Sequence, residues 1–387
     1  MPGPLSGLLV VGLEHSVAGP LCTRILGDLG ADVIKVERPP EGDFARHWDA
    51  NVHGDCSQFW WLNRRKKSVA LDLKTESGRE AFDALLARAD VLVSNQSPRA
   101  MDGLGLTREH LAATHPGLVT CSISGYGERG AFRERKAYDM LVQAESGIMS
   151  LTGSEDQPTR AGVSIADVST GIYAAALVLG AVVGRLRGQG GAYLDVAMFD
   201  ATVEFAGPML ISYLNAGIVY PRLPDRHHAI APYGVFRCAG GDRLLVAVHN
   251  DAEWRRVADR LLGRAELADD PRYATSVARL EHRHEVDELT AGALGALSKP
   301  EATRLLDEIR VAYGSVNDMG EVESHPATAE RSLIDEVETV TGAIARTLVG
   351  MGERLFSTSH GGRLRPPLLG EDTGSVLASL EVSTEPS

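Results

Sequence analysis

The sequence predicts an α/β fold built on a mostly parallel, doubly wound sheet. Three features indicate this class: short apolar runs typical of strands, segments with helical spacing of apolar residues, and regular alternation of the two. An apolar run at 8–13 precedes a helical pattern over 19–29, which stops at Gly30, and a second strand pattern covers 32–37. This alternation favours parallel strands, because each helix carries the chain back to the edge where the previous strand began.

The same alternation continues along the chain. Strand patterns at 68–73, 90–95 and 118–127 alternate with helical patterns at 76–88 and near 107–113. Ligands of doubly wound sheets bind beside the carboxyl ends of the strands. These ends hold His15, Glu37–Arg38, Asn95 and Gly125–Gly127.

A second helical block covers 139–149, 167–187 and 198–216, and a segment rich in Pro and His follows at 217–232. Beyond it lie a hairpin pattern around Gly240–Gly241 and helical patterns near 251–263 and 299–313. We therefore expect a large Rossmann-like α/β domain over 1–216, completed by the tail 326–387. A smaller α+β domain is expected over 225–325.

Composition narrows the class of protein. The net charge of −13 disfavours a nucleic-acid partner. The four cysteines are scattered without a CxxC pair, which indicates neither a metal site nor disulfides and favours the cytoplasm. The longest apolar stretch, 171–184, falls short of the ~20 residues that span a bilayer, and the N-terminus lacks signal-peptide features. We expect no membrane association.

Positive charge is concentrated early in the chain. Four of the six lysines lie between residues 35 and 74, together with Arg38, Arg46, Arg64 and Arg65. This zone is typical either of a site for a small polyanion or of a solvated turn. The first strand–helix–strand unit resembles a dinucleotide-binding unit, but Gly12 and Gly19 are seven residues apart and GxGxxG is missing, which disfavours NAD or flavin.

The stretch SIADVSTGIYAA (164–175) places Asp167 at the start of a long apolar helix. Aspartate is among the best N-caps, worth ~1 kcal/mol, so the local sequence favours a capping role. The helix N-terminus also attracts anions, which suits a reactive carboxylate. The two roles can coexist.

Eight stretches, in order, resemble the class III coenzyme A transferases, the family of formyl-CoA transferase, carnitine CoA-transferase and α-methylacyl-CoA racemase. They are 18–43, 63–79, 123–130, 137–153, 164–175, 190–201, 227–236 and 365–373.

The resemblance implies that Asp167 is the catalytic nucleophile. In this family the carboxylate attacks an acyl-CoA thioester, and an aspartyl anhydride and an aspartyl-CoA thioester follow before CoA passes to an acceptor acid. An ordinary aspartate has a pKa near ~3.9, so we expect an ionised nucleophile that needs no general base. The resemblance further implies an interlocked homodimer.

The resemblance also implies the substrate contacts, with CoA and acyl-CoA as substrates and no permanently bound cofactor. These residues are His15, Val17 and Ala18 at the pantetheine and thioester end, Arg38 at the adenosine phosphates, Leu71, Lys74, Asn95 and Gln96 around the adenine, and Lys136, Tyr138 and Asp139 near the acyl group.

Three departures from the family pattern refine the prediction. Gly103 stands where the family often has arginine, for which Arg99 is a candidate substitute. The glycine-rich loop of oxalate enzymes is absent, which disfavours formyl-CoA:oxalate transfer. Tyr138 replaces the histidine of the racemase branch, and a phenol with a pKa near ~10 is a poor acid–base group. We therefore expect a transferase, with a racemase and a catalytically inactive acyl-CoA-binding partner as alternatives.

Overall fold

The computed structural model describes residues 2–356 and 364–381. The chain forms two compact units. The first comprises Met1–Met149, Arg160–Ile211 and Ala327–Ser387, and the second comprises Ser150–Thr159 and Ser212–Pro326. Relative to the expected domains, the segments 150–159 and 212–216, together with Pro326, belong with the second unit. In the tail, 357–363 and 382–387 lie outside the described residues.

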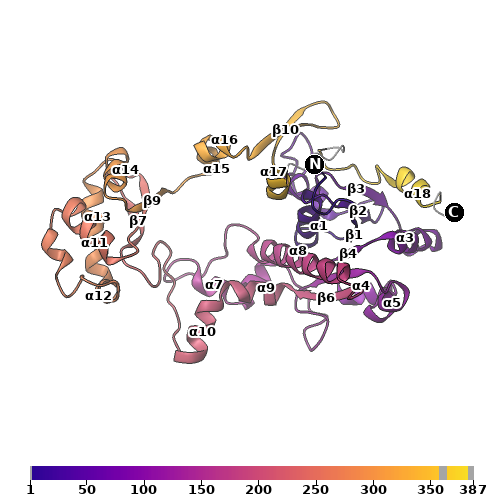
Figure 1. Ribbon diagram of the computed structural model, residues 1–387, viewed down its shortest axis with the longest axis horizontal. Helices are drawn as coiled ribbons and strands as arrows, with labels where there is room; N and C mark the ends of the chain where they lie inside the picture. Colours follow the sequence, from indigo (N-terminus) through magenta and orange to yellow (C-terminus); the bar gives the residue numbers. More distant parts are fainter. Residues whose placement is uncertain (1, 357–363, 382–387) are drawn as a thin grey trace. The chain divides into compact units, whose positions relative to one another are not determined.

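A six-stranded parallel sheet forms the centre of the first unit, which confirms the predicted fold class (Figure 1). Its strands are β1 (Leu9–Leu13), β2 (Asp32–Glu37), β3 (Lys67–Ala70), β4 (Val91–Ser94), β5 (Val119–Ser124) and β6 (Ala192–Ala197). The order is β3-β2-β1-β4-β5-β6, and β1 pairs with both β2 and β4. The order reverses between β1 and β4, where such sheets bind ligands.

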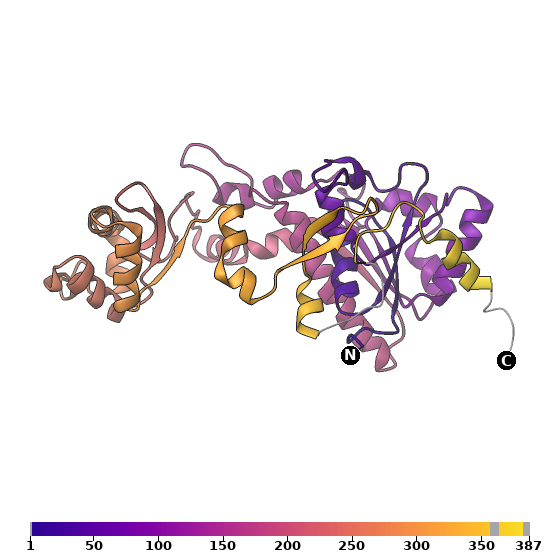
Figure 2. The same cartoon turned by 90° about the horizontal axis from the view of Figure 1, so that it is seen from above.

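Helices cover both faces of this sheet because successive strand residues point to opposite sides. Val10 packs with α1 (Ala18–Asp28) and α8 (Ile165–Leu186) on one face. Val11 packs with the other face, which is covered by α3 (Glu76–Arg88), α4 (Pro98–Gly103), α5 (Arg108–Thr114) and α18 (Thr373–Glu381). The tail thus returns to the first unit, where α18 contacts β3 and α3 (Figures 1 and 2).

Shorter elements complete the first unit. They are the 3-10 helix η1 (Phe44–His47), α2 (Ser57–Asn63), α6 (Asp139–Glu145), α7 (Ile148–Leu151), α9 (Met198–Phe205), α10 (Gly207–Ala216, which reaches the second unit), α16 (Pro326–Glu330), the hairpin β10 (Ile334–Glu338) and β11 (Ile344–Leu348), and α17 (Met351–Phe356). The prediction of one helix over 198–216 is wrong, because the chain breaks at Ala206. Gly207 has a low helix propensity, and Pro208 lacks the backbone N–H that would donate to the carbonyl group four residues earlier.

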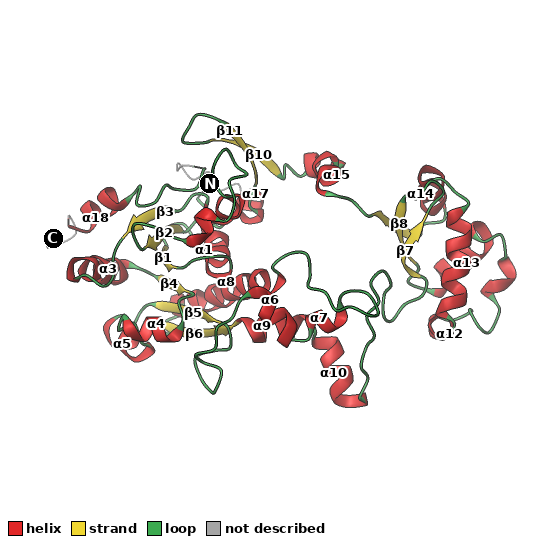
Figure 3. Ribbon diagram, turned by 180° about the vertical axis from the view of Figure 1, so that it is seen from behind, coloured by secondary structure: helices red, strands yellow, loops and turns green. Residues whose placement is uncertain are grey.

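The second unit holds a three-stranded antiparallel sheet in the order β7-β8-β9 (Figure 3). The predicted hairpin is β7 (Tyr233–Arg237) and β8 (Arg243–Ala247), and β9 is Ala312–Ser315. Around them lie α11 (Asp251–Arg256), the π-helix η2 (Val257–Leu261), the 3-10 helix η3 (Ala265–Ala268), α12 (Ser276–Glu281), α13 (Arg283–Gly295), α14 (Lys299–Glu308) and α15 (Met319–Ser324). Trp254, Val286 and Leu306 are fully buried at its core.

Helix α8 extends the apolar stretch that the sequence marks at 171–184 to 22 residues. Within the described part of the chain, it is the one helix that is long and apolar enough to cross a membrane, judged by length and composition alone. Ala174, Val178 and Val182 of this helix are buried against the sheet.

Candidate active site

A cavity of about 1080 Å³ lies at the carboxyl ends of β1, β4 and β5, entirely within the first unit. Nine of the twelve predicted site residues line it. They are His15, Val17, Ala18, Asn95, Gln96, Lys136, Tyr138, Asp139 and Asp167. The fold therefore brings together residues from distant parts of the sequence, such as His15 and Asp167, which are 152 positions apart.

The loop after β1 is fixed to the loop after β4 by two hydrogen bonds. The backbone N–H of His15 donates to Asn95 Oδ1 over 2.9 Å, and Asn95 Nδ2 donates to the carbonyl of His15 over 2.8 Å. The His15 ring packs on Phe44 with ring centroids 4.8 Å apart. Burial lowers the pKa of His15, so its ring is neutral at pH 7. Asn95 thus holds the cavity wall at the point where the strand order reverses.

Asp167 lies in the first turn of α8, inside the helix, and Ser164 is the N-cap residue. The prediction that Asp167 is the helix cap is therefore wrong. The capping oxygen comes from Asp139, whose Oδ1 accepts hydrogen bonds from the N–H groups of Ala166 (2.8 Å) and Asp167 (3.3 Å). No hydrogen bond to the Asp167 carboxylate is found among the described residues, so its oxygens are free to react.

Gln143 fixes the capping carboxylate in turn. This buried amide donates to Asp139 Oδ2 over 2.8 Å and accepts from the N–H of Ala161 over 2.9 Å. Asp139 opens α6, so one network joins the starts of α6 and α8 to the segment 160–163. The position of Asp167 is set by this network.

The surroundings of Asp167 raise its pKa to about 7, first through burial and then through the negative charge of Asp139. The expectation of a carboxylate with an ordinary pKa, fully ionised at neutral pH, is therefore wrong for the protein without substrate. The same burial removes water from the carboxylate, which makes an oxygen anion there more reactive.

The predicted basic zone is largely consumed by internal ion pairs. Lys35 and Lys66 are fully buried beside Glu14, and Arg64 pairs with Asp28 over 2.7 Å. Their positive charge is thus unavailable to a bound polyanion, and the sequence could not reveal it because the acidic partners lie far away in the chain.

Three predicted contact residues lie outside the cavity. Leu71 is buried in the sheet core, while Arg38 and Lys74 are exposed. Arg38 and Leu71 directly follow β2 and β3, so they lie at the same edge of the sheet as the cavity.

The cavity contains a group of cations that the sequence analysis largely missed. They are Arg99, Arg133, Arg135, Lys136 and Arg160. Arg133 pairs with Asp102 and Arg135 pairs with Glu145. Arg99, Lys136 and Arg160 form no ion pair in the part of the chain that the structure describes. The available signal was the charged run 133–136, which lies between two of the recognised motifs.

Two glycines of the recognised motifs allow close packing. A Cβ on Gly125, which lines the cavity, would lie 2.2 Å from the Cβ of Ala137. A Cβ on Gly171 would lie 2.8 Å from the carbonyl oxygen of Ala18. Gly171 therefore serves the close contact between α8 and α1.

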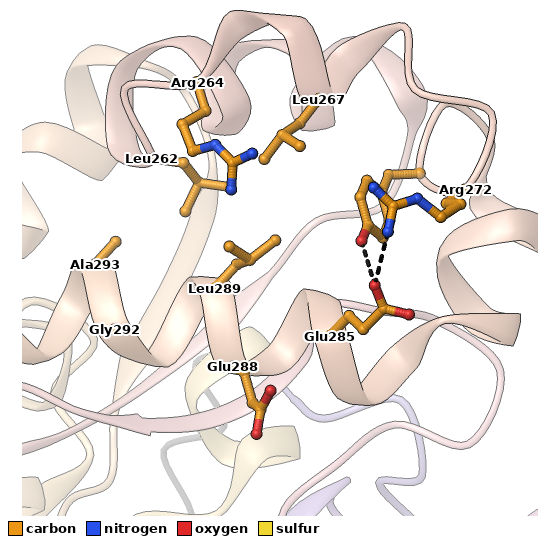
Figure 4. Close-up of a pocket in the computed structure, with 10 residues that line it drawn as sticks. Leu262, Arg264, Leu267, Arg272, Glu285, Glu288, Leu289, Gly292 and Ala293 are labelled. Atoms are coloured by element: carbon orange, nitrogen blue, oxygen red, sulfur yellow. Dashed lines mark hydrogen bonds and ion pairs between the residues drawn. The ribbon is translucent and has the colours of Figure 1, made fainter.

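A second cavity, of about 580 Å³, lies in the smaller unit (Figure 4). Its charged groups are paired with neighbours: Glu285 accepts from the hydroxyl of Tyr273 over 2.5 Å and pairs with Arg272 over 3.2 Å. Because it holds none of the predicted site residues, the first cavity is the candidate active site.

Comparison with known proteins agrees with this fold and identifies the family. The model of CoA-transferase family III matches residues 5–373. The chain is 35% identical to succinate–glutarate CoA-transferase of Agrobacterium fabrum, over 98% of this chain and 96% of that one. It is 38% identical to acetyl-CoA:oxalate CoA-transferase of Acetobacter aceti, over 86% and 85%.

Solved structures show the same architecture. A CaiB/BaiF family protein from Brucella suis superposes with a TM-score of 0.83 and 34% identity, over 98% of this chain and 100% of that one. A protein from Mycobacterium tuberculosis gives a TM-score of 0.83 and 28% identity, over 97% and 99%. The α/β architecture with its central parallel sheet is thus shared with CaiB/BaiF family proteins. The chain belongs to CoA-transferase family III, which confirms the expected resemblance.

Proposed function

We propose that this enzyme moves CoA between an acyl-CoA and a small dicarboxylic acid, with Asp167 as the covalent nucleophile. The observation that carries the proposal is the placement of Asp167. It lines the same cavity as the loops that follow β1 and β4, and its carboxylate lacks a hydrogen-bond partner among the described residues. The relatives named as transferases of succinate, glutarate and oxalate support the substrate class.

The proposed reaction proceeds in four balanced steps. An Asp167 oxygen attacks the thioester carbon, and the C–S bond breaks to give a mixed anhydride and CoA thiolate. The thiolate attacks the aspartyl carbonyl, which releases the donor acid and leaves an aspartyl-CoA thioester. The acceptor carboxylate attacks that thioester, and its C–S bond breaks to give a second anhydride and CoA thiolate. The thiolate then attacks the acceptor carbonyl of this anhydride, which forms the new acyl-CoA and releases the Asp167 carboxylate.

The protein contributes positioning and electrostatics to these steps. The two hydrogen bonds between His15 and Asn95 hold the loop that faces Asp167, so the reacting atoms meet in a fixed geometry. Burial of Asp167 keeps water away from the anhydride, which water would otherwise hydrolyse.

Three cations of the cavity, Arg99, Lys136 and Arg160, form no ion pair among the described residues, which supports an acceptor acid with a second carboxylate. Arg160 is best placed to bind it, because the N–H of the adjacent Ala161 is tied through Gln143 to the residue that caps the Asp167 helix. A guanidinium binds a carboxylate through two parallel hydrogen bonds. An acid with one carboxylate would leave this cation unpaired.

A CoA-exchange screen tests the proposal. Acyl-CoA donors are incubated with pooled mono- and dicarboxylic acids, and new CoA thioesters are identified by mass spectrometry. The proposal predicts exchange to dicarboxylic acids, and α-deuterium uptake without exchange would favour a racemase. Asp167→Asn serves as the control, since its amide cannot form the anhydride.

We also propose that the protein is a homodimer. Large apolar side chains of α8 and α9 are exposed in the single chain, namely Ile172, Leu177, Val183, Leu186 and Phe205. Apolar surface of this kind usually marks a protein interface. Light scattering coupled to size-exclusion chromatography distinguishes the dimer from a monomer of 41.4 kDa.

A further inference from the structure

A group of four buried charged side chains lies behind the loop that follows β1. It consists of Glu14, Lys35, Asp43 and Lys66, each at most 3% exposed. Lys35 Nζ donates to Asp43 Oδ2 over 2.9 Å and lies 3.4 Å from Glu14 Oε1. Lys66 Nζ donates to the same Glu14 oxygen over 2.8 Å. We call these four residues the buried charge cluster.

The two acids of the cluster are held ionised by its lysines, whereas burial lowers the pKa of Lys66 to about 8. Burial disfavours the carboxylates of Glu14 and Asp43, but the lysines outweigh that effect, and the pKa of each acid lies below its usual value. Two cations balance two anions. Burying these charges costs desolvation free energy, which apolar side chains of similar volume would avoid. Stability alone therefore does not explain the cluster.

What the cluster holds is the backbone of the cavity loop. Asp43 Oδ1 accepts hydrogen bonds from the N–H of Ser16 over 3.0 Å and from the N–H of Ala45 over 2.9 Å. Ser16 has φ = +62°, in the left-handed region that a serine adopts only when its surroundings impose it. Asp43 supplies that constraint from one side of the loop, while Asn95 holds His15 from the other.

Asp43 itself does not line the cavity, whereas His15, Ser16 and Val17 all do. Its influence on a substrate must therefore pass through the loop backbone. Lys35 determines which way the Asp43 carboxylate points, because it takes the oxygen that the backbone does not use.

We propose that Asp43, oriented by Lys35, is a positioning residue that holds the His15–Val17 loop in the shape that binds the thioester end of acyl-CoA. The proposal rests on the proposed function for its kinetic readout. It assigns the buried charge cluster to substrate binding rather than to folding.

Two substitutions separate the parts of this role. Asp43→Asn keeps an oxygen that accepts from Ser16 but loses the attraction to Lys35, and Asp43→Ala loses both. We expect kcat/KM for acyl-CoA to fall about 10-fold in the first and about 100-fold in the second, because small displacements of a positioning loop cost that much. The effect on kcat/KM for the acceptor acid should be smaller.

A rescue separates positioning from loss of structure. Glycine adopts φ near +62° without strain. The double variant Asp43→Ala, Ser16→Gly should therefore have a kcat/KM for acyl-CoA at least about threefold higher than that of Asp43→Ala. A substitution that merely damages the core would not be repaired by added backbone freedom. Ser16→Gly alone provides the reference value.

Asp90→Ala is the matched control. Asp90 also accepts from a backbone N–H (Leu9, 2.8 Å) and pairs with a cation (Arg185, 2.7 Å), but it lies at the amino ends of the strands and outside the cavity. We expect a lower melting temperature with unchanged kinetics. If Asp43→Asn and Asp43→Ala behave like this control, or if Ser16→Gly gives no rescue, the positioning role is overturned.

A measurement of CoA binding makes the test of the positioning role independent of catalysis. If the unaltered enzyme transfers no CoA to any acid, the proposed function fails, and the Kd of CoA measured by calorimetry then decides the positioning role. A Kd raised several-fold in Asp43→Asn but not in Asp90→Ala supports it, and equal Kd values overturn it.

Discussion

Asp139 caps the helix that carries Asp167: its Oδ1 accepts from the N–H of Asp167 itself, 3.3 Å away, and from that of Ala166. The two carboxylates are therefore held close together, with one oriented by hydrogen bonds and the other left without them. Asp139 both fixes the start of the helix and raises the pKa of Asp167. This pair explains how a half-buried aspartate can line a cavity and still have a raised pKa.

The raised pKa of Asp167 predicts the pH dependence of the first half-reaction. Only the ionised carboxylate attacks a thioester, so kcat/KM for acyl-CoA should fall about tenfold per pH unit below about 7 and level off above it. In Asp139→Asn, one source of the shift is removed, and the acidic limb should move to lower pH. A pH profile that is identical in the two enzymes would contradict this assignment.

The same shift predicts that Asp167 lowers stability at alkaline pH. Its pKa is raised in the folded state, so the favourable contribution of the protonated form is present below pH ~4 and is lost as pH rises through about 7. Asp167→Asn should therefore increase the free energy of unfolding by about 4 kcal/mol at pH 8 and by about a third of that at pH 5. Urea titrations at both pH values measure the difference, and an equal effect at both would contradict it.

The contact between α1 and α8 predicts opposite effects for two glycines of one helix. Gly171→Ala places a Cβ 2.8 Å from the carbonyl oxygen of Ala18, and the overlap should cost about 2 kcal/mol of stability. Gly180→Ala meets nothing within 4 Å and should stabilise by about 0.5–1 kcal/mol through helix propensity. Thermal unfolding of the two variants checks the sign of each change.

The proposed role of Arg160 predicts a selective effect on the acceptor. Arg160→Ala should raise KM for dicarboxylic acids by about 10-fold or more, because a charge-assisted contact is lost, and should leave kcat/KM for acyl-CoA nearly unchanged. Arg129→Ala, an exposed arginine outside the cavity, is the control. Equal losses for mono- and dicarboxylic acids would show that Arg160 does not recognise the second carboxylate.

The large-scale fold could be predicted because it follows from local patterns. The strands at 9–13 and 32–37 and the helix at 76–88 lie within a residue or two of the predicted ranges. Strand β6 was not predicted, since a single edge strand next to a helix carries little periodicity. The helices over 276–295 were missed as well, because α13 alternates polar and apolar residues weakly.

Nine of the predicted residues line the cavity, but the electrostatics of the cavity could not be predicted. The sequence identified Asp167 and Asp139, yet it could not show that Asp139 caps the helix of Asp167, 28 positions away. Likewise, Lys35 and Lys66 look like exposed cations until the fold buries them beside Glu14. Long-range pairing of charges leaves no pattern in a single sequence.

Covalent capture on Asp167 tests the central claim most directly. The enzyme is incubated with acyl-CoA, treated with hydroxylamine, digested, and analysed by mass spectrometry of the peptide that contains Asp167. We predict a hydroxamate on Asp167 that depends on acyl-CoA and is absent from Asp167→Asn. An active enzyme in which Asp167 stays unmodified, or in which Asp167→Asn transfers CoA at the original rate, would contradict it.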